Sequence, residues 1–172
     1  MYHNHPHSTA HIIALSALLT VLALIFSYIE AIVPFNSGIP GVKLGLANLV
    51  IITALYVLGF RYAMTINILR ILISGLLFNG FFAAIYSLAG GILSLTIMFV
   101  LKKTGLFSTV GVSMAGGVAH NLGQLLIAAL IISNIKLFVY FPVLLFSGMF
   151  SGILIGILTH MILKKLPKNL TN

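Results

Sequence analysis

The sequence predicts an all-α integral membrane protein with about six transmembrane helices, and three observations support this fold class. Hydrophobic residues make up 60% of the 172 residues, and the mean hydropathy is +1.21. Only 6% of the residues are charged, whereas a soluble domain carries about a quarter. The apolar residues gather in six long runs separated by short polar breaks. Such a chain cannot form a water-facing surface, so lipid must be its solvent.

Each apolar run is close to the roughly 20 residues that cross a hydrocarbon core, although the second and third are short. The runs cover residues 12–33, 44–60, 62–78, 81–101, 109–133 and 138–163. None alternates with the period of two that a barrel strand requires, so we expect helices. We predict a polar tail over residues 1–11, one membrane domain over 12–165 and a short tail over 166–172. The histidines of the first tail are not expected to form a metal site.

The distribution of basic residues predicts the topology, because cytoplasmic loops carry an excess of Lys and Arg. Six spans place both termini on the same side of the membrane. That side would carry Arg61, Lys102, Lys103, Lys164, Lys165 and Lys168. The opposite side would carry Lys43 and Lys136. We therefore expect both termini to be cytoplasmic.

The charged residues also exclude classes of function. Nine Lys and Arg accompany a single acidic residue, Glu30, and they are scattered rather than clustered as nucleic-acid binding requires. One carboxylate cannot supply a two-carboxylate glycosidase site or a Mg²⁺ site for phosphoryl transfer. The chain has no Cys and no GxxxxGK[ST] loop. We expect no enzymatic activity, no cofactor and no nucleic-acid partner.

Polar residues within the predicted spans are the most informative functional feature. Arg70 lies about 13 Å into the third span, and an ionised Arg there costs at least about 2.5 kcal/mol unless it faces a cavity or partner. Asn67 lies on the same helical face, and Asn79 lies at the outer end of that span. Further polar residues are expected at a similar depth on other spans, and these are Glu30, Lys43, Asn48, His120, Asn121 and Gln124.

These nine residues predict a polar pocket that opens outward above an apolar cytoplasmic half. Lys43 and Arg70 would make the pocket positive, which favours a small, anionic, partly apolar ligand. Structural interpretations stay open for each residue. Arg70 and Glu30 would then form an ion pair, the asparagines would hydrogen-bond between helices, His120 would be a core residue and Lys43 would extend to the interface.

Small residues recur at four-residue spacing, as in Gly148, Gly152 and Gly156 of the last span. Such ridges let helix backbones approach closely. Packing within one bundle is the simpler interpretation, and docking of a partner helix is the alternative for ridges on the first or last span.

Several motifs resemble those of one family. Residues 39–49 read IPGVKLGLANL, residues 116–124 read GGVAHNLGQ, and residues 86–91 read YSLAGG. Together with Asn67-x-x-Arg70-x-x-x-Ser74-Gly75, they resemble the Gx transporter family, which is also labelled heptaprenyl diphosphate synthase component I. The resemblance covers nearly the whole chain from about Ala10.

That family is similar to the substrate-binding S components of energy-coupling factor transporters, which are six-helix proteins of bacterial plasma membranes. The resemblance implies capture of a vitamin, a flavin, or an isoprenoid or quinone precursor from outside. It implies a transmembrane T subunit with two ATPase subunits as partners, docked on a small-residue face formed by Ala10, Ala14 and Ala17. A transport subunit is the leading hypothesis.

The synthase label suggests a second hypothesis. Prenyl diphosphate synthases hold Mg²⁺-diphosphate with aspartate-rich motifs, and this chain has no Asp. It would then be a non-catalytic membrane scaffold for a polyprenyl diphosphate synthase or for a flavin-linked electron-transfer assembly. A channel is a third, weaker hypothesis, because the apolar cytoplasmic half offers no continuous polar path.

Overall fold

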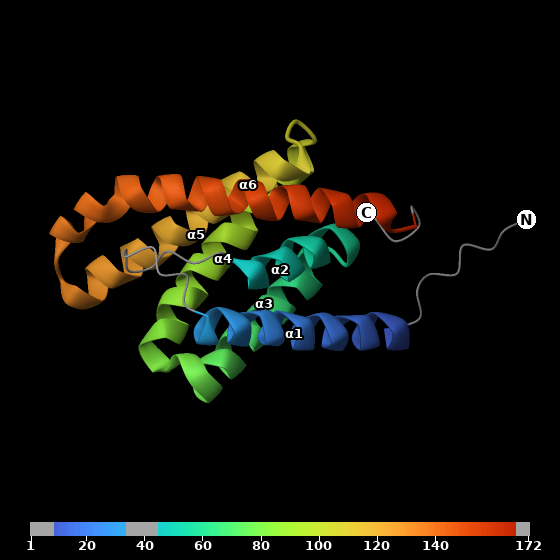
Figure 1. Ribbon diagram of the computed structural model, residues 1–172, viewed down its shortest axis with the longest axis horizontal. Helices are drawn as coiled ribbons and strands as arrows, with labels where there is room; N and C mark the ends of the chain where they lie inside the picture. Colours follow the sequence, from blue (N-terminus) through green and yellow to red (C-terminus); the bar gives the residue numbers. More distant parts are fainter. Residues whose placement is uncertain (1–8, 34–44, 168–172) are drawn as a thin grey trace, which may run out of the picture.

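The computed structural model describes residues 9–33 and 45–167, and nearly all of them are helical (Figure 1). The α-helices are α1 (Thr9–Ile32), α2 (Leu46–Val57), α3 (Phe60–Ser74), α4 (Phe81–Thr104), α5 (Thr109–Ile132) and α6 (Phe141–Lys165). A π-helical turn, η1 (Gly75–Asn79), extends α3, and a 3₁₀ helix, η2 (Ile135–Tyr140), precedes α6. The described part of the chain contains no strand. The predicted all-α fold with six apolar helices is confirmed.

Five segments are long and apolar enough to cross a membrane, and α2 is the exception. Its 12 residues rise only about 18 Å, against a hydrocarbon core of roughly 30 Å. Glycines set its limits, because Gly45 at φ +78° and Gly59 at φ +86° adopt conformations that L side chains rarely take. The second predicted span, over residues 44–60, is therefore longer than the helix that forms there.

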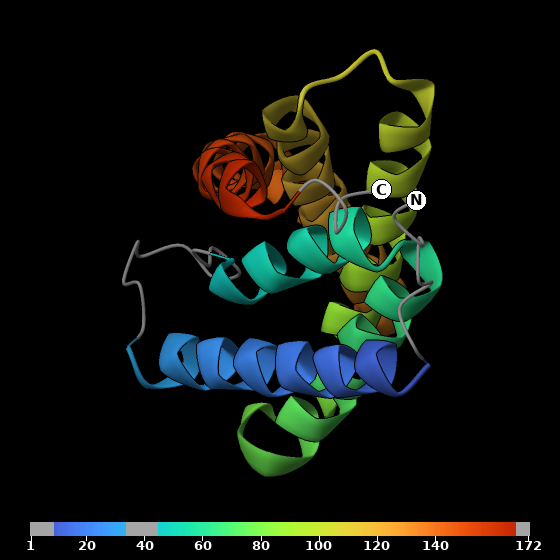
Figure 2. The ribbon, with the colours of Figure 1, turned by 90° about the vertical axis from the view of Figure 1, so that its right-hand side faces the viewer.

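The helices divide into two groups (Figures 1 and 2). α5 packs most extensively against α6 and α4, whereas α1, α2 and α3 pack against one another. Figure 2 views α6 almost end-on while α1 runs across the picture, so these two helices cross obliquely. The start of α1 and the end of α6 lie toward the same end of the molecule. The cytoplasmic location of that end stays a prediction.

The short helix α2 lies at the centre of the fold. Seven of its 12 residues are buried, and Ile51, Ile52 and Leu55 are each no more than 2% exposed. Its C-terminal end is held by α4, because Lys102 Nζ donates to Leu55 O at 3.1 Å and lies 4.8 Å from the Tyr56 ring centroid. The long helices expose many large apolar side chains on their outer faces, as expected for surfaces in contact with lipid.

The glycine ridge of α6 packs against α5. A Cβ atom on Gly152 would lie 2.7 Å from Met114 Cα, and one on Gly156 would lie 2.7 Å from Val110 Cα. A Cβ on Gly148 would lie 2.8 Å from Gly117 O. The backbones therefore meet directly, which supports the interpretation of this ridge as packing within one bundle.

We expect Gly152→Val to destabilise the protein by about 1–3 kcal/mol, because the added atoms meet backbone that cannot move aside. Thermal unfolding in detergent measures the effect as a lowered midpoint. Ile157→Val, on an exposed part of the same helix, is the matched control and should leave the midpoint nearly unchanged. Equal midpoints for both variants would contradict the packing described here.

Candidate functional site

One polar cavity of about 60 Å³ lies at the start of α2, and all six α-helices and η1 contribute to its wall. Its volume exceeds the roughly 10–15 Å³ that a single water molecule requires. The lining residues are Ser27, Glu30, Gly45, Ala47, Asn48, Arg70, Ser74, Asn79, Ser87, Gly117, His120, Asn121, Gln124 and Ser151. Seven of the nine predicted site residues are among them. Of the other two, Asn67 does not line the cavity but accepts hydrogen bonds from Arg70. Lys43 lies outside the described residues.

The cavity exists because α2 begins inside the bundle. Helix α1 ends at Ile32. Near that end, its Glu30 side chain reaches the first residues of α2. Glu30 Oε1 accepts hydrogen bonds from Gly45 N at 2.6 Å and Leu46 N at 2.9 Å. These amides have no partner within the helix, and a carboxylate at a helix N-terminus is favoured by the helix dipole. The carboxylate thus satisfies two of the leading amides of α2.

Arg70 projects from α3 into this cavity and is only 8% exposed. Its Nε and Nη2 donate to Asn67 Oδ1 at 3.2 and 3.0 Å, and Nη2 also donates to Asn48 Oδ1 at 3.3 Å. Nη1 lies 3.5 Å from Ser27 Oγ. Within the described part of the chain, every one of these acceptors is a neutral oxygen. Hydrogen bonding therefore positions the guanidinium without a carboxylate paired directly to it.

Asn67 holds the guanidinium in place, and its own position depends on a glycine. It is 1% exposed and lies one turn before Arg70. A Cβ on Gly91 of α4 would lie 2.7 Å from Asn67 Nδ2. The amide thus occupies space that only glycine leaves open, which is the structural role of the second glycine in the YSLAGG motif.

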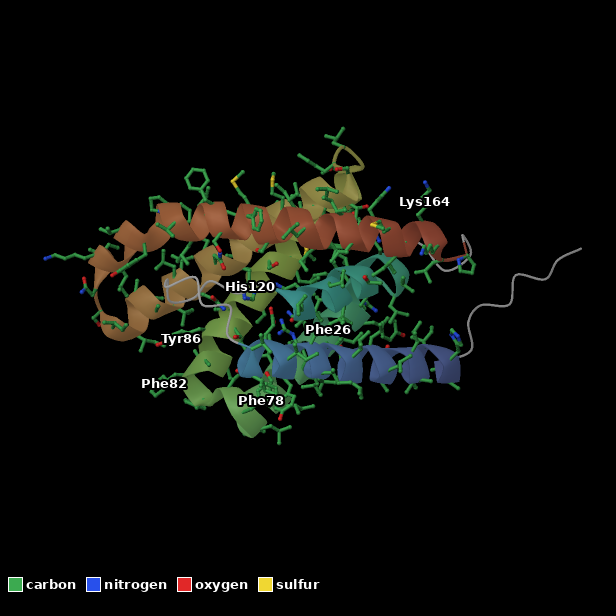
Figure 3. All side chains as sticks on the ribbon, viewed as in Figure 1. Phe26, Phe78, Phe82, Tyr86, His120 and Lys164 are labelled. Atoms are coloured by element: carbon green, nitrogen blue, oxygen red, sulfur yellow. The ribbon has the colours of Figure 1, made fainter. Side chains whose placement is uncertain are left out.

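The α5 side of the cavity carries an amide–imidazole pair. Gln124 Nε2 lies 3.0 Å from His120 Nε2, one helical turn away, and Figure 3 shows His120 in the interior of the bundle. The neighbouring Asn121 donates through Nδ2 to Leu144 O of α6 at 2.7 Å. Asn121 therefore links two helices, whereas His120 and Gln124 present polar atoms to the cavity.

The structure places three of the predicted residues more closely. Asn48, expected at a depth similar to that of Arg70, lies beside it and accepts a hydrogen bond from Arg70 Nη2. Both described hydrogen bonds of Glu30 come from backbone amides, whereas an ion pair with Arg70 was the structural alternative for this residue. Asn79 is the last residue of the π-helical turn that continues α3, at the end of the span where it was predicted.

The sequence did not single out three serines of the cavity wall, which are Ser27, Ser87 and Ser151. Ser27 lies three residues before Glu30, so it shares the face that meets α2. Ser151 lies within the glycine ridge of α6, where small residues are expected for packing alone. Small polar residues are common between transmembrane helices, so their presence in the sequence does not single out a site.

The proposed docking face of α1 is exposed. Ala10, Ala14 and Ala17 lie on the outer surface of this helix, which is the least buried of the long apolar helices. The docking role of these residues stays a prediction.

The fold and the cavity define an all-α, multi-pass membrane protein with an internal polar site. The family model for heptaprenyl diphosphate synthase component I matches residues 19–162, and the chain belongs to this family. No curated protein and no solved structure matches the chain.

We expect Glu30→Gln to loosen the start of α2, because an ionised acceptor is roughly twice as strong as a neutral one. A loss of about 1.4 kcal/mol in the free energy of local opening would raise the population of the open state roughly tenfold. Hydrogen exchange of residues 45–50 measures this, with Lys103→Gln at the exposed end of α4 as a control for charge removal. Unchanged exchange in Glu30→Gln would contradict the capping role.

Proposed function

We propose that this protein is a non-catalytic membrane subunit that binds an organic anion in the cavity at the start of α2. The observation that carries the proposal is the buried Arg70 guanidinium, which borders a cavity and is held by neutral oxygens. A charge buried in this way is costly without a partner. An anion in the cavity would supply that partner.

The donors around the cavity suit an anion with several oxygens. A guanidinium has five N–H donors in a rigid fork, and its geometry matches carboxylate and phosphate groups. The serines, Asn79 and the Gln124 amide add neutral donors on other helices. Glu30 is directed to the amides of α2, so its charge is already partly balanced by the helix terminus.

The chain lacks the carboxylates of a Mg²⁺-diphosphate site, which supports a non-catalytic role. A Mg²⁺-diphosphate site needs several carboxylates, and the whole sequence contains one acidic residue. That residue caps α2. Binding and positioning are the roles that remain for this cavity.

The family name supports a partnership with a prenyl diphosphate synthase. The chain belongs to a family named as component I of heptaprenyl diphosphate synthase, and a component implies a second one. We propose that a separate subunit supplies the catalytic carboxylates. The membrane protein itself would hold an anionic reactant or product of that synthase at the membrane.

Transport is the second candidate function. It is favoured by the enclosure of the cavity by all six helices and by the exposed small-residue face of α1, which suits a docking helix. In this case the protein would be the S component of an energy-coupling factor transporter, with a T subunit and two ATPases as partners in a bacterial plasma membrane.

We expect Arg70→Gln to weaken binding of inorganic phosphate at least tenfold, because hydrogen bonds to charged groups contribute about 1.5–3 kcal/mol. Isothermal titration calorimetry of the purified protein in detergent measures the affinity. Arg61→Gln, at the exposed start of the same helix, is the matched control and should bind as the wild type does. Failure of the wild type to bind phosphate, or equal affinities for both variants, would overturn the proposal.

Affinity purification from membranes separates the two candidates. A synthase subunit without ATPases is expected if the protein is an accessory component. Recovery of a T subunit with ATPases, lost in an Ala14→Leu variant, would replace that proposal with transport.

A further inference from the structure

An apolar groove of about 480 Å³ lies between α4, α5 and the η2–α6 segment. Its volume falls within the roughly 300–1,000 Å³ typical of small-molecule sites. Its wall is mainly aliphatic and aromatic, and includes Ala83, Ala128, Ile132 and Leu144. The groove is therefore apolar, whereas the wall of the polar cavity contains charged residues.

The groove and the polar cavity adjoin each other. Ser87 and Gln124 line both of them, so the two spaces meet at these side chains. Gln124 Nε2 also contacts His120 Nε2 on the cavity side. Figure 3 shows Tyr86 of the groove further from the centre of the bundle than His120. Polarity therefore changes abruptly across a single pair of residues.

The crossing of α4 and α5 explains why the groove lies on this side. The helices touch where a Cβ on Gly123 would lie 2.9 Å from Ala89 O, and one on Gly90 would lie 2.6 Å from His120 O. Beyond this point, the start of α4 and the end of α5 line the groove. Figure 1 shows the two helices crossing there. Two glycines thus fix both the contact and the opening beside it.

We infer that the two spaces form one site for an anionic amphiphile with a single apolar chain, an inference that rests on the proposed function. The anionic head lies beside Arg70, and the chain passes Ser87 and Gln124 into the groove. A head alone would leave the larger space unfilled. A wholly apolar molecule would leave the buried guanidinium hydrogen-bonded to neutral oxygens alone.

Chain length gives this inference a quantitative test. Burying one methylene group contributes about 0.8 kcal/mol, which corresponds to roughly a fourfold gain in affinity. For monomeric butyl, hexyl and octyl phosphate, affinity should therefore rise by roughly an order of magnitude for each two carbons added. Inorganic phosphate should bind most weakly.

The matched variants are Ala128→Phe, which fills the groove, and Ala17→Phe, which adds the same ring to the exposed face of α1. Calorimetry is performed with the full chain in detergent, using inorganic phosphate and the three alkyl phosphates. Ala128→Phe should bind inorganic phosphate as the wild type does but lose the gain with chain length. Ala17→Phe should keep the full gain, and Arg70→Gln should lose affinity for every probe.

The outcomes separate the two proposals. If the wild type binds no phosphate, the proposed function fails. If it binds phosphate but octyl phosphate binds no more tightly, or if Ala128→Phe keeps the gain, the head site stands and the groove inference is wrong. If phosphatidic acid in nanodiscs displaces octyl phosphate from the wild type, the occupant is a two-chain bilayer lipid, and the single-chain inference is overturned.

Discussion

The arrangement of the whole protein depends on the contact between the Glu30 carboxylate and the first amides of α2. A helix that begins inside a membrane protein leaves its leading N–H groups without water, and each unsatisfied group is costly. The only acidic residue of the chain satisfies two of them. This contact stabilises the start of α2, beside the cavity that Arg70 lines. Lys102 completes the arrangement by holding the opposite end of the same helix.

The architecture was accessible from the sequence because it follows from local properties. Apolar runs of sufficient length, the turn-forming residues between them and the lack of charge predict helices in lipid without reference to tertiary contacts. The four-residue spacing of Gly148, Gly152 and Gly156 likewise predicts close packing. The extent of α2 was less accessible, since Gly45 and Gly59 resemble ordinary glycines of membrane helices until their positive φ values are known.

The candidate site was predictable only in part, for a related physical reason. Arg70 and the polar residues of α5 were identifiable because such side chains are expensive within a membrane. The partner of each one depends on the rotation and tilt of helices, which a sequence does not specify. Glu30 therefore accepts hydrogen bonds from backbone amides, and Asn48 accepts one from the guanidinium. The adjoining groove depends on the crossing of α4 and α5 and has no signature in the sequence.

The wall of the polar cavity takes side chains from every α-helix, so no hairpin or smaller set of helices contains the site. A ligand that fills the cavity would be enclosed by residues from the first helix to the last. By mass action, a ligand at a hundred times its dissociation constant adds about 2.7 kcal/mol to the folded state. A bound ligand would thus stabilise the assembled protein. Newly inserted chains would gain this stabilisation only after α6 had packed against the other helices.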